Sequence, residues 1–184
     1  MKKKKILIIL VLICISILYF MQCFKVNKAY PAPEIVNVKK GDSVDINGLS
    51  YKVLGHDLKD MEDFKKHIPT YAKYDDVFSL KCDYNILIVD LEVKNNTKNN
   101  YSFQIYDICI ESCGFTNGVS DDYEFEKEED NQKSFDIKPG ESVKVKLTYS
   151  LAEKMFNKSI WENIENTKFV LVPSLYPKNV RMEI

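Results

Sequence analysis

The sequence predicts a mostly β protein, an antiparallel β-sandwich with short helical insertions, preceded by one N-terminal transmembrane helix. Two observations predict the sandwich. Short segments of alternating apolar and polar residues follow one another after residue 33, and turn residues separate them without long helical patterns. The helix is predicted by four lysines that stand directly before a long uncharged apolar run.

The apolar run at residues 6–24 is long enough to cross a membrane as one helix. Its residues rise by about 1.5 Å each and together span roughly 28 Å, close to the ~30 Å hydrocarbon core. The lysines at residues 2–5 outweigh Lys25 and Lys28 on the other flank, and the more basic flank stays in the cytoplasm. We therefore expect a single-pass protein of the cell membrane with a cytoplasmic N-terminus and an extracytoplasmic C-terminal domain.

Two other fates of this segment stay open. A cleaved signal peptide has a shorter apolar region that ends in a small-x-small site, whereas this run closes with the bulky residues 19–24. A lipid anchor on Cys23 needs small residues before it, and Met21 and Gln22 are not small. We expect an uncleaved anchor, with signal cleavage and lipidation of Cys23 as alternatives.

The predicted organisation has three parts: the lysine cluster and anchor at residues 1–24, an extended tether at 25–33, and one β-sandwich domain at 34–184. Residues 25–184 keep 22 of the 26 basic residues and all 27 acidic ones, a net charge of −5. This sign disfavours nucleic acid and anionic lipid as partners.

The external cysteines, Cys82, Cys109 and Cys113, are odd in number and have no repeated spacing. If Cys109 and Cys113 share an extended strand, their Cα atoms are roughly 13 Å apart, too far for a bridge. A bond from Cys82 to either one stays open. Otherwise all three act as small, partly buried apolar residues.

The sharpest local pattern is a β-hairpin at residues 43–53, with alternating residues on both sides of Asn47-Gly48. The type I′ turn that this pair favours matches Ile46 with Leu49 and Val44 with Tyr51. The period then changes at residues 60–68, where we expect a short helix capped by Asp60 and ended by Pro69.

The central strand is predicted at residues 84–95, with four apolar side chains on one face: Leu87, Val89, Leu91 and Val93. A polar turn at 95–100 and one or two strands at 101–110 follow. Residues 113–118 break the pattern, and Phe115, Asn117 and Gly118 are the candidate binding loop. An aromatic residue between loop glycines either binds a partner or plugs the end of the core, and both interpretations stay open.

Seven acidic side chains crowd residues 121–130. Calcium prefers such oxygens, but the EF-hand order is missing, and alternation with Tyr123 and Phe125 also suits a charged edge strand. We expect a solvated acidic segment, with a calcium site as the alternative.

The last third of the sequence predicts a strand at 134–137, a type II turn at Pro139-Gly140 and a strand through Tyr149. Capping boxes of Ser150 with Glu153 and of Ser159 with Glu162 predict two short helical turns. Their expected core-facing residues are Met155, Phe156, Trp161 and Ile164. Strands at 169–175 and 180–184 close the chain.

Motifs for catalysis are missing from the sequence: it has no HExxH, CxxC pair, phosphate loop or GxSxG. His56 and His67 are the only histidines. A zinc site of either with Cys109 and Cys113 is not required by any spacing, and a cysteine nucleophile needs a histidine within about 4 Å. We predict no catalytic residue, no cofactor and no metal ligand.

Several short patterns together resemble a bacterial family of membrane-anchored, extracytoplasmic domains of unknown function, similar in organisation to immunoglobulin-like, telokin-like ectodomains. The segments that carry the resemblance are the lysine-led apolar run, residues 28–31, the hairpin at 41–53, 93–95, Asn117-Gly118, 138–141 and 174–177. The resemblance implies an immunoglobulin-like sandwich outside the membrane. It implies no catalytic residues, because the family has no assigned activity.

The resulting hypothesis is a non-catalytic, membrane-anchored binding or accessory module of the bacterial cell envelope. Its expected partner is a protein, a peptide or an envelope component, with residues 6–24 in the membrane, and its oligomeric state is left undetermined. The alternative is a small envelope hydrolase or a redox or metal-binding protein that uses the cysteines and histidines.

Overall fold

The computed structural model describes residues 2–60, 82–120 and 134–184. The predicted helix after Asp60, His67 and the acidic run at 121–130 lie outside these residues. The chain divides into two units, Met1–Glu34 and Ile35–Ile184, which are considered separately.

The first unit is built on one long helix, α1 (Lys2–Ala29). Its segment Ile8–Ala29 has a mean hydropathy of 2.3 and is long and apolar enough to cross a membrane, a property that signal sequences share. The helix extends into the tether predicted as extended at residues 25–33: the Tyr30 amide still donates to the Val26 carbonyl at 2.8 Å. Pro31 follows and, lacking an N–H, cannot continue the helix.

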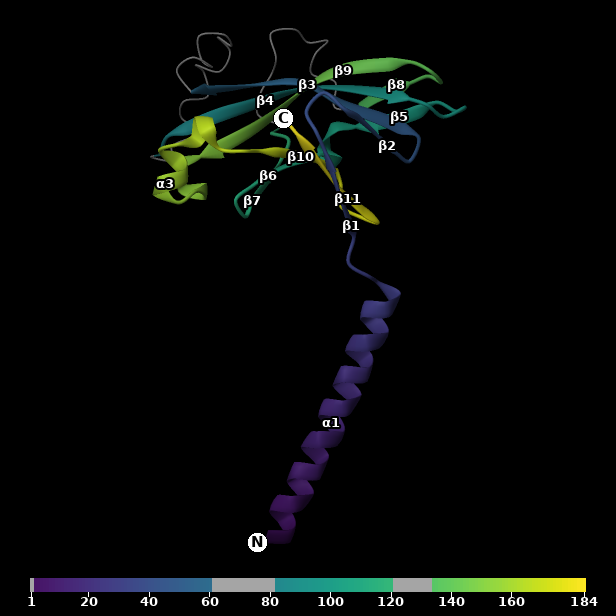
Figure 1. Cartoon of the computed structure of the whole chain (residues 1–184), viewed down its shortest axis with the longest axis vertical. Helices are drawn as coiled ribbons and strands as arrows, with labels where there is room; N and C mark the ends of the chain where they lie inside the picture. The colour runs from purple at the N-terminus through teal and green to yellow at the C-terminus, as the bar shows by residue number, and fades with distance from the viewer. Residues whose placement is uncertain (1, 61–81, 121–133) are drawn as a thin grey trace. The chain divides into compact units, whose positions relative to one another are not determined.

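The second unit is the β-domain, and its strands form three sheets (Figure 1). The first sheet has the order β1 (Glu34–Val38), β11 (Lys178–Glu183), β10 (Val170–Ser174), β6 (Cys109–Ser112) and β7 (Phe115–Gly118). The second has the order β2 (Ser43–Ile46), β3 (Leu49–Asp60), β4 (Tyr84–Asn95) and β9 (Ser142–Ala152). The third pairs β5 (Tyr101–Gln104) with β8 (Ser134–Ile137).

Short helical turns connect these strands: η2 (Ile105–Asp107), η4 (Glu153–Met155), α3 (Lys158–Trp161) and η5 (Ile164–Asn166). Figure 1 shows β2, β5 and β8 gathered at one end of the β-domain, with α3 at the other. The two ends therefore present different loops.

A single hydrophobic core joins the three sheets, which confirms the predicted β-sandwich. Leu91 of β4, Leu171 of β10 and Ile137 of β8 are all fully buried in it. The four apolar residues predicted to share one face of β4 are buried, as the alternation requires: Leu87, Val89, Leu91 and Val93.

The predicted hairpin is also confirmed. β2 pairs with β3 antiparallel, with Ile46 opposite Leu49 and Val44 opposite Tyr51. Asn47 and Gly48 have φ of 51° and 85°, as a type I′ turn requires at both central positions.

Strand β3 runs further than the sequence pattern predicts, to Asp60 instead of Val53. Its register against β4 shifts between Val53 and Gly55, so Leu54 is an extra, exposed residue in a bulge. A bulge reverses the alternation of inward-facing and outward-facing side chains. The sequence pattern therefore does not show that the strand continues beyond Val53. His56 therefore lies within β3.

The Pro139-Gly140 turn has the predicted type II geometry. Gly140 has φ of 78°, and the Glu141 amide donates to the Lys138 carbonyl at 3.0 Å. This turn leads directly into β9, where Val145, Leu147 and Tyr149 point into the core.

Both predicted capping boxes are wrong, although short helical turns do form in this region. Ser150 belongs to β9, and the cap of α3 is Asn157, whose side-chain oxygen accepts from the Ile160 amide at 3.0 Å. Asn caps a helix as well as Ser does, so Asn157 starts α3 ahead of Ser159.

Of the four expected core-facing residues in this region, three are confirmed. Ile164 is buried, and Phe156 and Trp161 pack partly buried against the core. Met155 is instead 52% exposed, because it lies at the end of the three-residue turn η4 and points away from the core.

Candidate functional site

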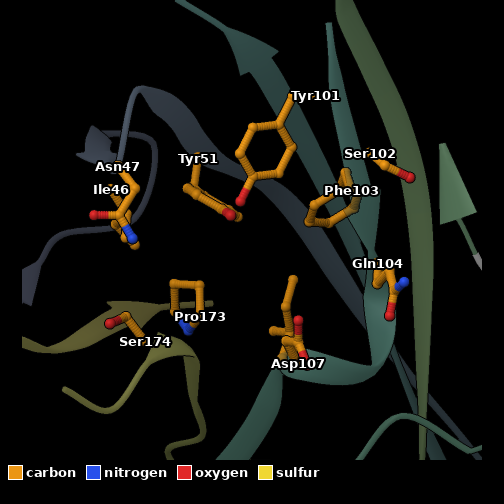
Figure 2. A pocket seen from close by; sticks show the side chains of 11 residues that line it. Ile46, Asn47, Tyr51, Tyr101, Ser102, Phe103, Gln104, Asp107, Pro173 and Ser174 are labelled. Atoms are coloured by element: carbon orange, nitrogen blue, oxygen red, sulfur yellow. The ribbon is translucent and has the colours of Figure 1, made fainter. Parts of the chain in front are cut away.

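A groove of about 430 Å³ opens at the end of the β-domain where all three sheets contribute residues (Figure 2). The β2–β3 turn, β5, the η2 region and β10 form its walls. Its lining residues are Ile46, Asn47, Tyr51, Tyr101, Ser102, Phe103, Gln104, Asp107, Ile108, Pro173 and Ser174.

Aromatic side chains shape one wall of the groove. Tyr51 is only 7% exposed, and its ring packs edge-on against Phe103, with the centroids 6.1 Å apart. Tyr101 lies at the mouth and is 36% exposed. Figure 2 shows the hydroxyl ends of Tyr51 and Tyr101 turned toward the same open space, with Asp107 and Pro173 across it.

The lining of the groove carries a negative charge at neutral pH. Asp107 is the one residue in the lining that is charged at neutral pH. Burial, then the neighbouring Tyr101 and Asp107, raise the pKa of Tyr51 to about 12. Tyr51 therefore keeps its proton at every physiological pH and offers a neutral hydroxyl to the groove, across from the Asp107 carboxylate.

A buried asparagine fixes the frame of this end of the domain. Asn95 is fully buried, and its amide nitrogen donates to the carbonyls of Ile137 and Asn99, both at 2.8 Å. Its amide oxygen accepts from the Thr97 amide at 2.9 Å and the Thr97 hydroxyl at 2.7 Å. The side chain thus makes four hydrogen bonds, the full capacity that its two donors and one oxygen allow.

The residue after Asn95 fastens the hairpin that lines the groove. The Asn96 amide donates to the Gly48 carbonyl at 2.9 Å, and its side chain donates to Asp45 at 2.9 Å. Since Ile137 ends β8 and β8 pairs with β5, Asn95 and Asn96 together tie the β2–β3 turn to the β5 wall. The groove is therefore preformed by the fold.

The candidate binding loop at residues 113–118 is not a loop. Cys113 and Gly114, with φ of 47° and 83°, form a tight turn, and Phe115–Gly118 is strand β7, paired with β6. The sequence pattern hid this strand because it is short and contains Asn117 and Gly118, which usually mark turns.

The side chains of the predicted loop make structural contacts. The ring of Phe115 packs against Phe156 with the centroids 4.5 Å apart, and Phe156 stacks on Trp161. Asn117 donates to the Ser150 carbonyl of β9 at 2.9 Å. These contacts support the interpretation of Phe115 as a plug at the α3 end of the core, and the groove lies at the other end.

The described histidine and Cys109 lie on strands of different sheets. His56 is on β3, where its Nδ1 is 3.5 Å from the Lys40 ammonium, and Cys109 is on β6 of another sheet. Burial, followed by Lys40, lowers the pKa of His56. Cys82, Cys109 and Cys113 are all free thiols, so the disulfide left open by the sequence does not form.

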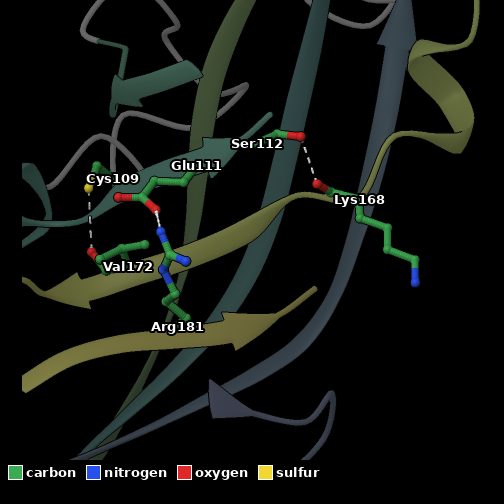
Figure 3. A network of polar contacts seen from close by, with 6 residues as sticks. All are labelled: Cys109, Glu111, Ser112, Lys168, Val172 and Arg181. Carbon is green, nitrogen blue, oxygen red and sulfur yellow. Dashed lines mark hydrogen bonds and ion pairs between the residues drawn. The ribbon is translucent and has the colours of Figure 1, made fainter. Parts of the chain in front are cut away.

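The thiol of Cys109 lies against the backbone of the neighbouring strand β10 (Figure 3). It donates weakly to the Val172 carbonyl at 3.7 Å, and burial, then Glu111, raises its pKa, which disfavours the reactive thiolate. Within residues 2–60, 82–120 and 134–184, no three His, Cys, Asp or Glu side chains are placed to hold a metal ion.

The same face carries an ion pair that crosses a strand. Arg181 of β11 reaches over β10 to Glu111 of β6, and the Ser112 hydroxyl donates to the Lys168 carbonyl at 2.7 Å (Figure 3). These contacts tie three strands of the first sheet together, and we assign them to stability.

Comparison with known proteins identifies the family. Residues 27–179 match the family described as "Domain of unknown function (DUF5028)". The chain belongs to this family. DUF5028 thus covers the whole β-domain except its last residues and begins near the end of α1. No protein of curated function matches the chain.

The fold of this DUF5028 chain also occurs in solved bacterial structures. It is similar to the Bacillus subtilis protein ycdA, described as "a putative lipoprotein", with 18% identity and a TM-score of 0.50, over 79% of this chain and 38% of that one. It is also similar to an uncharacterised β-sandwich protein of Clostridium difficile 630, with 10% identity and a TM-score of 0.46, over 83% and 95% of the two chains. At such identities the likeness to ycdA shows the fold alone.

The sequence pattern does not reveal the groove residues. Asn47, Tyr101 and Pro173 lie far apart in the chain, and only the strand order brings them to one end. The local signals were the Asn-Gly turn and a tyrosine that directly follows a polar turn, and neither pattern by itself indicates a binding site.

Proposed function

We propose that this DUF5028 chain is a non-catalytic binding module of the bacterial cell envelope, anchored in the membrane by α1 and presenting its β-domain on the extracytoplasmic side. The observation that carries the binding role is the preformed groove, which combines aromatic rings with amide, hydroxyl and carboxylate groups. Its volume lies in the range of small-molecule sites, about 300–1,000 Å³.

The anchoring rests on the chemistry of α1. Its apolar stretch matches the thickness of a bilayer, and the lysines at residues 2–5 favour a cytoplasmic N-terminus. The raised pKa of the Cys109 thiol disfavours this cysteine as the nucleophile of a thiol-based hydrolase or redox protein.

Site-specific photo-crosslinking tests the binding role in the native envelope. The photoreactive residue p-benzoylphenylalanine replaces Tyr101 at the groove mouth in one full-length protein and Leu54 in another. The two positions are matched in exposure, at 36% and 42%, and Leu54 is outside the groove lining. Illuminated cells should yield an adduct at position 101 that is missing at position 54, measured by the mass of the purified protein. Adducts at both positions alike, or at neither, would contradict the proposal.

A further inference from the structure

The charge and ring content of the groove restrict the ligands that it can hold. Three aromatic rings, those of Tyr51, Tyr101 and Phe103, line it together with the Asp107 carboxylate, and no Lys, Arg or His is in its lining. An anionic ligand would meet a like charge without a cationic partner, which costs free energy. A neutral or cationic ligand meets no such penalty.

We propose that the groove binds an organic cation, an ammonium group that lies between the hydroxyl groups of Tyr51 and Tyr101 and the Asp107 carboxylate. This inference rests on the proposed binding role and names the ligand class of that site. Tyr51 and Phe103 are buried, so their ring faces are closed to a ligand, and the groove presents the hydroxyl groups of Tyr51 and Tyr101. The Asp107 carboxylate across from these hydroxyls attracts a positive charge directly.

The surroundings of Tyr51 agree with this assignment. Part of the rise in its pKa comes from Asp107, which means that the potential at its hydroxyl disfavours an added negative charge. The same potential favours a positive charge in the space that the two tyrosine hydroxyls face (Figure 2). Both hydroxyl oxygens can also accept hydrogen bonds from a primary ammonium group.

The remaining lining accommodates the uncharged part of such a ligand. A trimethylammonium group fills only part of about 430 Å³. Asn47 supplies an amide group at the opposite side of the groove. A hydroxylated or amide-bearing chain attached to the cation would find hydrogen-bonding partners there.

Calorimetric titration of the full chain in a non-ionic detergent tests the inference. Choline is the cationic probe, and 3,3-dimethylbutan-1-ol, which has the same shape without the charge, is its matched control. We expect choline to bind at least about fivefold more tightly than the neutral isostere, since only choline carries a charge that the Asp107 carboxylate attracts. Equal affinities would overturn the proposal, and so would tighter binding of the neutral sugar N-acetylglucosamine.

Variants locate the binding in the groove. Asp107→Asn should weaken choline binding about threefold or more, a moderate loss because Asp107 is exposed and screened by solvent. Asp136→Asn is the control: it removes the same charge from β8, outside the groove lining, and should leave the affinity unchanged. Tyr101→Leu should also weaken binding. Equal effects of the two aspartate variants would show that the charge seen by choline is not at the groove.

Two further binding measurements distinguish the possible sources of the cation. Binding of free choline and of Nα-acetyl-lysine amide indicates a soluble or peptide-borne ammonium group, whereas binding of phosphatidylcholine vesicles without the free probes indicates a lipid headgroup. If position 101 crosslinks in cells and no ammonium probe binds, the cation inference fails and the binding role stands. If neither occurs, both fail.

Discussion

Gly48→Ala should lower the free energy of unfolding of the β-domain by about 2–5 kcal/mol. Two separate costs add at this position. Gly48 has φ of +85°, where a residue with a Cβ loses roughly 1–2 kcal/mol. The new Cβ would also lie 2.4 Å from Cγ2 of Thr97, an overlap that forces a shift worth about 1–3 kcal/mol.

A second glycine separates these two costs. Gly41 has nearly the same φ, +84°, and a Cβ there would meet nothing within 4 Å. Gly41→Ala should therefore lose only about 1–2 kcal/mol, the backbone cost alone. Thr97→Ser removes the overlapping methyl group and keeps the hydroxyl that bonds Asn95, so it should restore part of the stability of Gly48→Ala. Urea unfolding measures these differences in the unsubstituted protein, Gly41→Ala, Gly48→Ala and the Gly48→Ala, Thr97→Ser double variant. Equal losses of stability in Gly41→Ala and Gly48→Ala would contradict the close contact with Thr97.

Asn95→Asp should be at least as damaging, with a loss of about 3–5 kcal/mol, although the two side chains have almost the same shape. The substitution replaces the amide nitrogen, which donates to the carbonyls of Ile137 and Asn99, with an oxygen that cannot donate unless it is protonated. The buried Ile137 carbonyl loses this partner, which costs about 1–3 kcal/mol, and the burial of a carboxylate adds to it, whereas the Asn99 carbonyl still accepts from the Thr97 hydroxyl.

The neighbouring asparagine provides the control for that change. Asn96 is exposed and donates from its side chain to Asp45 on the surface. Asn96→Ala should cost about 0.5–1 kcal/mol, the typical worth of one solvent-exposed hydrogen bond. Similar urea midpoints for the Asn95 and Asn96 variants would show that the buried network does not hold this end of the domain.

Residues that specify structure through their near neighbours in sequence were predicted well. The Asn47-Gly48 turn, the alternation along β4 and the Pro139-Gly140 turn each depend on a few adjacent side chains, and the structure confirms all three. Where one residue interrupts the local rule, prediction failed. The bulge at Leu54 concealed the second half of β3, and Asn157 capped α3 in place of the serine that completes a capping box.

The candidate site depends on long-range contacts, which a single sequence does not reveal. Asn95 looked like the first residue of a polar turn, yet its side chain is fully buried and bonds Ile137, 42 residues away. Phe115 looked like a loop aromatic, but the partner that makes it structural, Phe156, lies on a connection between other strands. The groove likewise exists only after three sheets have assembled.

The location of the β-domain is the central claim, and the exposed thiol of Cys113 at the β6–β7 turn allows a direct test. Intact cells that produce the full chain are treated with a membrane-impermeant maleimide, and the mass of the labelled protein is measured beside that of Cys113→Ser. A Lys3→Cys variant reports the cytoplasmic side. The account predicts a Cys113-dependent label on the uncleaved chain in intact cells, with position 3 labelled only after lysis. A Cys113 that reacts only after lysis, or a labelled chain that lacks α1, would contradict it.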